Sequence, residues 1–163
     1  RIAKQYFTYL KDGKGTQEVV LGDGRILLER ELANKTRQQF DILAVDAFSG
    51  DGIPVHLLTR EAFALYWEHL KPDGILAIHI SNRHFDFSPV VRALAREVAK
   101  HALWIRDLSD LKKGNDYNEW ILVTSNQAFL KDPFVNFRIQ PWPTPKEILW
   151  TDDYSNLFQV VVP

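Results

Sequence analysis

The chain has 163 residues, of which 45% are hydrophobic, and its 20 basic residues nearly balance its 21 acidic ones. This size and composition predict one globular domain with a single hydrophobic core. The balanced charge, without long runs of one sign, excludes the electrostatic footprint of nucleic-acid and membrane-surface binders and favours a small-molecule ligand. No apolar stretch approaches the ~20 residues that cross a bilayer, so we expect the chain itself to be soluble. The absence of cysteine excludes disulfides, thiolate nucleophiles and cysteine-ligated metals.

The first part of the chain predicts two helices, a short strand and then a buried strand. Residues 2–10 place apolar side chains on one helical face, and residues 19–21, Val-Val-Leu, predict a strand after a polar loop. Asp23 is suited to cap the helix predicted over residues 25–38. The apolar run over residues 40–46 predicts a buried strand that ends in a carboxylate and then turns through small residues.

The rest of the chain continues to alternate helix and strand patterns. Thr59 is a good N-cap for a helix that stops at residues 71–74, Lys-Pro-Asp-Gly. A strand over residues 75–80 and a helix that starts at Ser88-Pro89 follow. Two further strands are predicted, and a proline-rich tail should wrap the surface after them; these segments are residues 103–105, 120–123 and 127–163.

This alternation predicts an α/β fold with a parallel sheet, in which the carboxyl ends of the strands form one edge. Asp23, Asp46 and the pair Ser81-Asn82 would lie at this edge, where open α/β sheets bind ligands. Each has a purely structural alternative. Asp23 would cap the next helix, Asp46 would bind neighbouring backbone amides, and Ser81-Asn82 would form a turn.

Other candidate sites fail on spacing. Residues 12–16, Asp-Gly-Lys-Gly-Thr, follow no predicted strand and lack the ending of a P-loop, so we interpret them as a surface turn. The five histidines show no metal-ligand spacing, and we interpret His79, which lies within a strand, as a hydrogen-bonded core residue. No metal is predicted. Ser49 does not stand in the Gly-x-Ser-x-Gly turn of an α/β-hydrolase nucleophile.

An ordered set of motifs resembles the spermidine synthase (polyamine aminopropyltransferase) family. It comprises residues 22–25 (Gly-Asp-Gly-Arg), 40–46, 57–61 and 70–76, and the resemblance runs from residue 1 to about residue 126. Residues 46–51 and 151–155 are most similar to the spermidine synthase-like branch, whose members are often soluble domains fused to membrane segments. The resemblance implies a Rossmann-like fold of the S-adenosylmethionine-dependent methyltransferase type, with a mostly parallel sheet and flanking helices.

The resemblance also implies roles for individual residues. Asp23 and Gly24 would bind the adenine of decarboxylated S-adenosylmethionine or of its thioether product, and Asp46 would be the catalytic aspartate. Ser49 and Asp51 would bind the other end of a diamine substrate. The family commonly has a second aspartate three positions after the catalytic one, and Ser49 stands there in this chain, which puts the identity of the amine in doubt.

The family's glycine-rich loop and its ribose-binding acidic residue have no counterpart, because the chain begins just beyond where they should lie. The chain starts at Arg1 and contains no methionine, so we expect a fragment that lacks the first two strands of the fold. Either residues 19–21 pair beside the Asp46 strand, or another chain fills the gap. We expect residues 1–126 to form a partial Rossmann-like domain, and residues 127–163 to be an extension packed on it.

Aminopropyl transfer from decarboxylated S-adenosylmethionine to an amine is the leading functional prediction, with the fragment inactive alone. One alternative is a methyltransferase-like enzyme that uses intact S-adenosylmethionine. Another is a non-catalytic nucleotide- or polyamine-sensing domain fused to a membrane transporter. The expected partner is a small amine rather than a nucleic acid, with a homodimer and a membrane fusion left open. The expected location is the cytoplasm, alone or as the soluble domain of a membrane protein.

Overall fold

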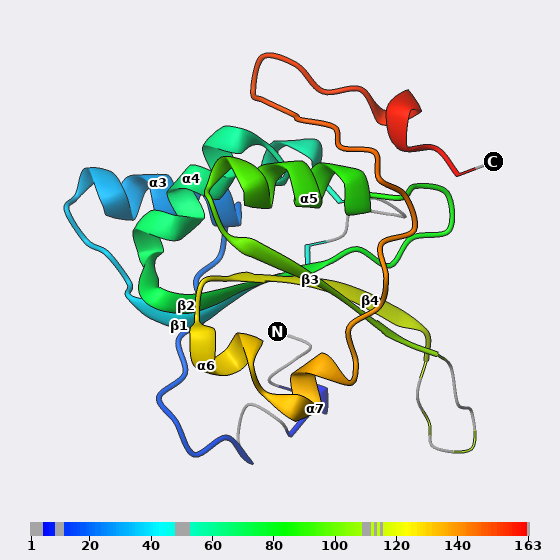
Figure 1. Cartoon of the computed structure of the whole chain (residues 1–163). Helices are drawn as coiled ribbons and strands as arrows, with labels where there is room; N and C mark the ends of the chain where they lie inside the picture. Colours follow the sequence, from blue (N-terminus) through cyan, green and yellow to red (C-terminus); the bar gives the residue numbers. More distant parts are fainter. Residues whose placement is uncertain are drawn as a thin grey trace.

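The computed structural model describes residues 5–8, 12–47, 53–108, 112, 114 and 116–162. Helices and strands alternate up to the third strand, as the sequence predicts (Figure 1). The elements are, in chain order, α3 (Gly24–Ala33), β1 (Phe40–Val45), the 3₁₀ turn η1 (Val55–Leu57), α4 (Arg60–His69), β2 (Leu70–His79), α5 (Ser88–Glu97), β3 (His101–Asp107), β4 (Asn118–Thr124), α6 (Gln127–Leu130), α7 (Pro133–Asn136) and the 3₁₀ turn η2 (Leu157–Val160).

The sheet has the strand order β1-β2-β4-β3. β1 and β2 are parallel, whereas β4 is antiparallel to both of its neighbours. Three strands therefore run in one direction, which confirms the mostly parallel α/β fold, and β4 runs in the other. Among the described residues no helix lies between β3 and β4, and these two strands pair as an antiparallel hairpin.

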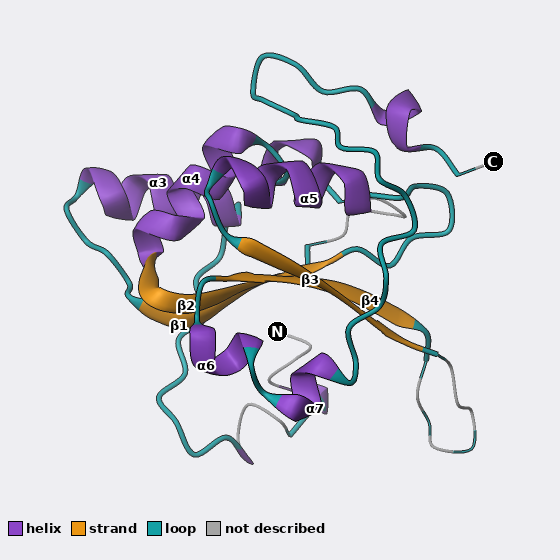
Figure 2. Ribbon diagram, in the orientation of Figure 1, coloured by secondary structure: helices purple, strands orange, loops and turns teal. Residues whose placement is uncertain are grey.

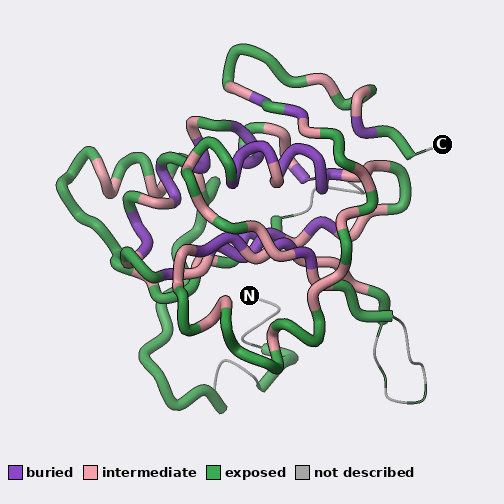
Figure 3. Tube along the Cα trace, in the orientation of Figure 1, coloured by how far each residue is buried: buried purple, intermediate pink, exposed green. Residues whose placement is uncertain are grey.

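The hydrophobic core lies between the sheet and the two helices α4 and α5. Figure 2 shows α3, α4 and α5 on one side of the sheet and α6 and α7 on the other. The buried residues of the fold concentrate in α4, α5 and the central strands, where these layers face each other (Figure 3). They include Phe63, Leu76, Ile78, Leu94 and Ile121, none of which is exposed to solvent.

The start of α4 is as predicted, but its end differs. Thr59 is the N-cap, and its side chain accepts a hydrogen bond from the amide of Ala62. The helix gives way directly to β2, so residues 71–74 form an irregularity within a strand rather than a turn before it. A larger residue than Gly74 would be crowded there, because a Cβ would lie 3.0 Å from both the side chain of Leu70 and the carbonyl oxygen of Lys71.

The prediction of a strand over residues 19–21 is wrong. Val19, Val20 and Leu21 belong to no strand and are 55%, 56% and 89% exposed, since no neighbouring strand accepts them. β1 is therefore the edge of the sheet within the described residues, and its Ile42 is 62% exposed. Of the helix predicted over residues 2–10, only residues 5–8 are described, and Gln5 and Tyr6 are helical.

The C-terminal tail packs against the body of the fold through main-chain hydrogen bonds. Its amides and carbonyls bond to β3, to the starts of α4 and α5 and to the loop before α5, in the pairs Gln140 to Trp104, Trp150 to Arg60, Ile148 to Pro89 and Val162 to His84. The Trp150 side chain is fully buried and meets the ring of Phe87 edge-on at 6.2 Å. The tail also contains the short helices α6 and α7, and a division at residue 126 stays a prediction.

None of the helices in the described parts of the chain combines the length and the apolar character needed to cross a membrane.

Candidate active site

Asp46 follows the last residue of β1, at the carboxyl end of the strand. Its side chain is 54% exposed, and its Oδ1 lies 2.7 Å from Nδ1 of His79. The strand register explains this contact, because Val45 is paired with Ile78 in the parallel neighbour, which brings the next residue of each strand together. The sequence places Asp46 correctly at a strand end, but it does not predict this partner.

His79 is the last residue of β2, and both of its ring nitrogens have polar neighbours. Nε2 lies 2.7 Å from Oγ of Ser81, which also accepts a hydrogen bond of 2.7 Å from the amide of Glu119. The imidazole stacks on the ring of Trp120 at 4.7 Å. The interpretation of His79 as a core residue is wrong, since its side chain is 20% exposed and faces Asp46.

Asp23 caps α3, and it also holds a histidine. Its Oδ1 accepts a hydrogen bond of 3.0 Å from the amide of Ile26, and its Oδ2 lies 2.9 Å from Nε2 of His56. The hydrogen bond from the Ile26 amide holds the pKa of Asp23 below its usual value of 3.8, and His56 adds to this effect. The capping alternative is thus present in the structure. A ligand that uses Asp23 would share Oδ2 with His56.

The loop after α3 leads into the start of β1, so the start of α3 and the end of β1 both lie away from that loop (Figure 1). Asp23 immediately precedes this helix, and Asp46 immediately follows this strand. Gly24 begins α3, and among the described residues no atom lies within 4 Å of the Cβ that a side chain would add. Ser49 and Asp51 lie outside the described residues, and all of these assigned roles stay predictions.

A cluster that the sequence does not predict joins the tail to α3 and α4; we name it the tail clasp, and it consists of Arg25, Thr59, Glu61 and Asp152. Arg25 donates two hydrogen bonds to the carboxylate of Asp152, at 2.7 and 2.5 Å. Asp152 also accepts from the hydroxyl of Thr59 at 2.7 Å, and its amide donates to Glu61 at 2.9 Å. The hydrogen bonds from Arg25 lower the pKa of Asp152 to about 2.

The tail clasp connects two of the motifs that carry the family resemblance. Arg25 belongs to residues 22–25, and Asp152 belongs to residues 151–155. Arg25 also donates to the carbonyl of His56 at 2.7 Å, so the same guanidinium supports the residue that contacts Asp23. The two motifs can be seen in the sequence, but the contact between Arg25 and Asp152 cannot be inferred from it, because they are 127 positions apart.

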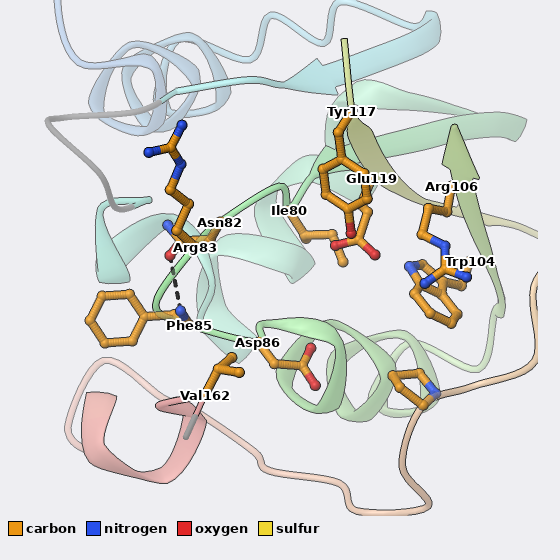
Figure 4. Close-up of a pocket in the computed structure, with 11 residues that line it drawn as sticks. Ile80, Asn82, Arg83, Phe85, Asp86, Trp104, Arg106, Tyr117, Glu119 and Val162 are labelled. Atoms are coloured by element: carbon orange, nitrogen blue, oxygen red, sulfur yellow. Dashed lines mark hydrogen bonds between the residues drawn. The ribbon is translucent and has the colours of Figure 1, made fainter. Parts of the chain in front are cut away.

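A cavity of about 270 Å³ opens on the face of the sheet opposite to the one that carries the His79 side chain (Figure 4). It is lined by Ile80 and Glu119, whose side chains alternate with those of His79 and Trp120 along the strands and so point to the opposite face. Burial and a hydrogen bond with Glu119 raise the pKa of Tyr117, which also lines this cavity, to about 12. The cavity is therefore separate from the Asp46–His79 pair. Within the described part of the chain, no three His, Asp or Glu side chains gather closely enough to hold a metal ion.

Comparisons with known proteins agree with the motifs and with the fold. No family model matches the chain. Over 76 residues it is 37% identical to a polyamine aminopropyltransferase of Vibrio vulnificus (strain CMCP6), a match that covers 47% of this chain and 24% of that protein. A spermidine synthase from Thermotoga maritima superposes with a TM-score of 0.51 at 13% identity, over 93% of this chain and 50% of that one. The chain is thus similar in fold to a spermidine synthase and, over those 76 residues, similar in sequence to a polyamine aminopropyltransferase.

A second solved structure supports the same fold. It is a spermidine synthase in complex with the transition-state analogue AdoDATO, with a TM-score of 0.52 and 15% identity over 93% of this chain and 51% of that one. The chain spans about half the length of these two solved structures and about a quarter of the curated relative.

Proposed function

We propose that the full-length protein transfers an aminopropyl group from decarboxylated S-adenosylmethionine to an amine, and that this chain supplies the catalytic aspartate. The observation that carries the proposal is the place of Asp46. In a spermidine synthase-like fold, it is a half-exposed carboxylate at the carboxyl end of a strand, with one oxygen beside His79. Ligands of open α/β sheets bind at this edge.

Asp46 has the chemistry that this reaction needs. The amine nitrogen attacks the methylene carbon beside the sulfonium, the carbon–sulfur bond breaks, and the electron pair of that bond leaves with the thioether. The attacking nitrogen must be neutral, so a carboxylate that takes its proton acts as a general base. The same negative charge stabilises the cationic ammonium product.

Asp23 and Gly24 would bind the adenine of the aminopropyl donor. The exocyclic amine of adenine would donate to Oδ2 of Asp23, the oxygen that lies beside His56. Gly24 leaves open space where any other residue would carry a Cβ, which supports a close approach of a planar ring to the start of α3. Ser49 and Asp51, in the turn after Asp46, would bind the far end of the acceptor amine.

We further propose that the chain is inactive alone and is completed by upstream residues that pair with β1. Within the described residues, β1 is an edge strand, and unpaired backbone at the edge of a buried site is costly to leave uncovered. The amine is the expected small-molecule partner. We place the protein in the cytoplasm, either alone or joined to membrane segments, and assign residues 127–163 to an extension of the same domain.

Product analysis of the full-length protein tests this function. It would be incubated with decarboxylated S-adenosylmethionine and a panel of diamines and polyamines of increasing length, and the products identified by mass spectrometry. We expect at least one amine to gain an aminopropyl group, and the isolated chain to transfer none.

A parallel incubation with intact S-adenosylmethionine separates the alternatives. A methylated amine would instead indicate a methyltransferase. Binding of the thioether product or of a polyamine, with no transfer to any amine, would overturn the proposed reaction in favour of a sensing domain.

A further inference from the structure

Four groups form a chain of short contacts that ends at Asp46. They are the amide of Glu119, the hydroxyl of Ser81, the imidazole of His79 and Oδ1 of Asp46, and each successive pair is 2.7 Å apart. This series of contacts starts at the amide of Glu119 in β4 and passes to the end of the neighbouring strand β2. Its first group therefore belongs to the sheet itself.

The chemistry of these groups fixes the direction of the hydrogen bonds. A backbone amide can only donate, so Oγ of Ser81 accepts from Glu119. An ionised carboxylate can only accept, so the Nδ1 that lies beside Oδ1 of Asp46 carries a hydrogen and donates it. In a neutral imidazole Nε2 then has no hydrogen, and it accepts from the hydroxyl of Ser81.

We propose that His79 is a positioning residue for the catalytic carboxylate, a role that rests on the proposed function. The Nδ1–H group holds Oδ1 of Asp46 and so directs the second oxygen toward the incoming amine. Ring stacking on Trp120, with an angle of 17° between the planes, fixes the orientation of the imidazole. An Nδ1–H group donates whether or not the imidazole is charged, so the positioning role depends only on this hydrogen bond.

Two substitutions separate the hydrogen bond from the ring stacking. His79→Phe keeps an aromatic ring on Trp120 but removes the donor. His79→Asn removes the ring but places an amide N–H close to the former Nδ1, so it can still donate to Asp46. His101→Phe is the matched control, because His101 is exposed at the start of β3, at the opposite end of the sheet.

The measurements are kcat and KM for aminopropyl transfer by the full-length protein. We expect His79→Phe to lower kcat by about 10- to 100-fold, because a displacement of about 1 Å in a catalytic group can cost about 100-fold. The KM for the aminopropyl donor should stay within about 2-fold, since His79 acts on the carboxylate rather than on the nucleotide. His79→Asn should recover most of the lost kcat, and His101→Phe should match the wild type.

The possible outcomes separate this role from the proposed function. Wild-type kcat in His79→Phe, or an equal loss in His79→Phe and His79→Asn, would overturn the positioning role while the transferase function stands. A wild-type protein that transfers to no amine would overturn the function and this role with it. Nitrogen NMR of the histidine ring adds a readout without turnover: neutral His79 should carry its proton on Nδ1, and a proton on Nε2 would contradict the proposed direction.

Discussion

The tail clasp and the Asp46–His79 pair both contain a carboxylate, but the two carboxylates are held very differently. Asp152 accepts two hydrogen bonds from a guanidinium that is only 13% exposed, and a third from Thr59. Asp46 is 54% exposed and has an imidazole beside one oxygen. A carboxylate committed to an arginine has a low proton affinity and serves folding, whereas the Asp46 carboxylate is accessible to a ligand. The contrast predicts that Asp152 contributes to the stability of the fold and that Asp46 contributes to turnover.

The largest effect should come from Asp46→Asn, which keeps the shape of the side chain but removes the base. We expect turnover to fall by about 100- to 10,000-fold, the range typical of general-base catalysis. Binding of the thioether product, measured by calorimetry, should stay within about 2-fold, and the melting temperature should not fall. Unchanged turnover would remove Asp46 from the mechanism.

The next largest effect should come from Trp150→Ala, which removes the buried anchor beside the tail clasp. Trp150 is 0% exposed, and truncation of a buried tryptophan costs about 3–5 kcal/mol of unfolding free energy. Trp150→Phe is the matched control. Its cost should be smaller, because the indole N–H of Trp150 has no hydrogen-bond partner in the described part of the chain. Urea denaturation measures both, and equal losses would contradict the packing argument.

A smaller loss of stability is expected from Asp152→Asn. This change removes the charge that Arg25 meets but keeps a side chain of the same size. Because the Asp152 side chain is 40% exposed, we expect a loss of about 1 kcal/mol rather than the larger cost of a fully buried pair. Turnover per folded molecule should change far less than in Asp46→Asn, and a loss as large as that one would contradict the division between the two acids.

The contribution of Asp152 should also depend on pH. Its pKa is lowered from 3.8 to about 2 in the folded protein, so its stabilising effect is complete above about pH 5 and is progressively lost as the pH falls to 2 and below. The difference in unfolding free energy between the wild type and Asp152→Asn should therefore shrink across this window. A difference that stays constant from pH 5 to pH 2 would show that the charge of Asp152 is not what stabilises the tail.

The smallest effect should come from Asp41→Asn at the edge of the sheet. Asp41 forms an ion pair with Lys71 at 2.5 Å, but their side chains are 80% and 42% exposed. Exposed pairs contribute about 0–1 kcal/mol, so this variant should differ from the wild type by less than about 0.5 kcal/mol. A loss equal to that of Asp152→Asn would show that burial does not distinguish the two ion pairs.

The parts of the fold that depend on local sequence could be predicted. Hydrophobic periodicity and an N-cap were enough to place α4, and an apolar run that ends in Asp46 was enough to place β1. The strand predicted over residues 19–21 failed because a strand needs a neighbour, and local sequence does not show which neighbours are present.

The candidate site could be predicted only where the position of a residue depends on the helix or strand next to it in the sequence. Asp46 is at a strand end in both sequence and structure, and Asp23 has the capping geometry that its position suggests. The contact between Asp46 and His79 depends on the register of two strands, and that between Arg25 and Asp152 on the path of the whole tail. Such pairings follow from tertiary structure, and residue spacing along one chain does not reveal them.

The outer edge of β1 also affects how the isolated chain will behave. Within the described residues no strand pairs with this edge, and an unpaired edge is a template for another strand, so separate copies at high concentration should associate edge to edge into β-rich aggregates. The exposed charges of Asp41 and Lys71 beside this edge oppose such stacking. Neutralising both should make the chain less soluble on storage, even though each contributes little to the free energy of the folded state.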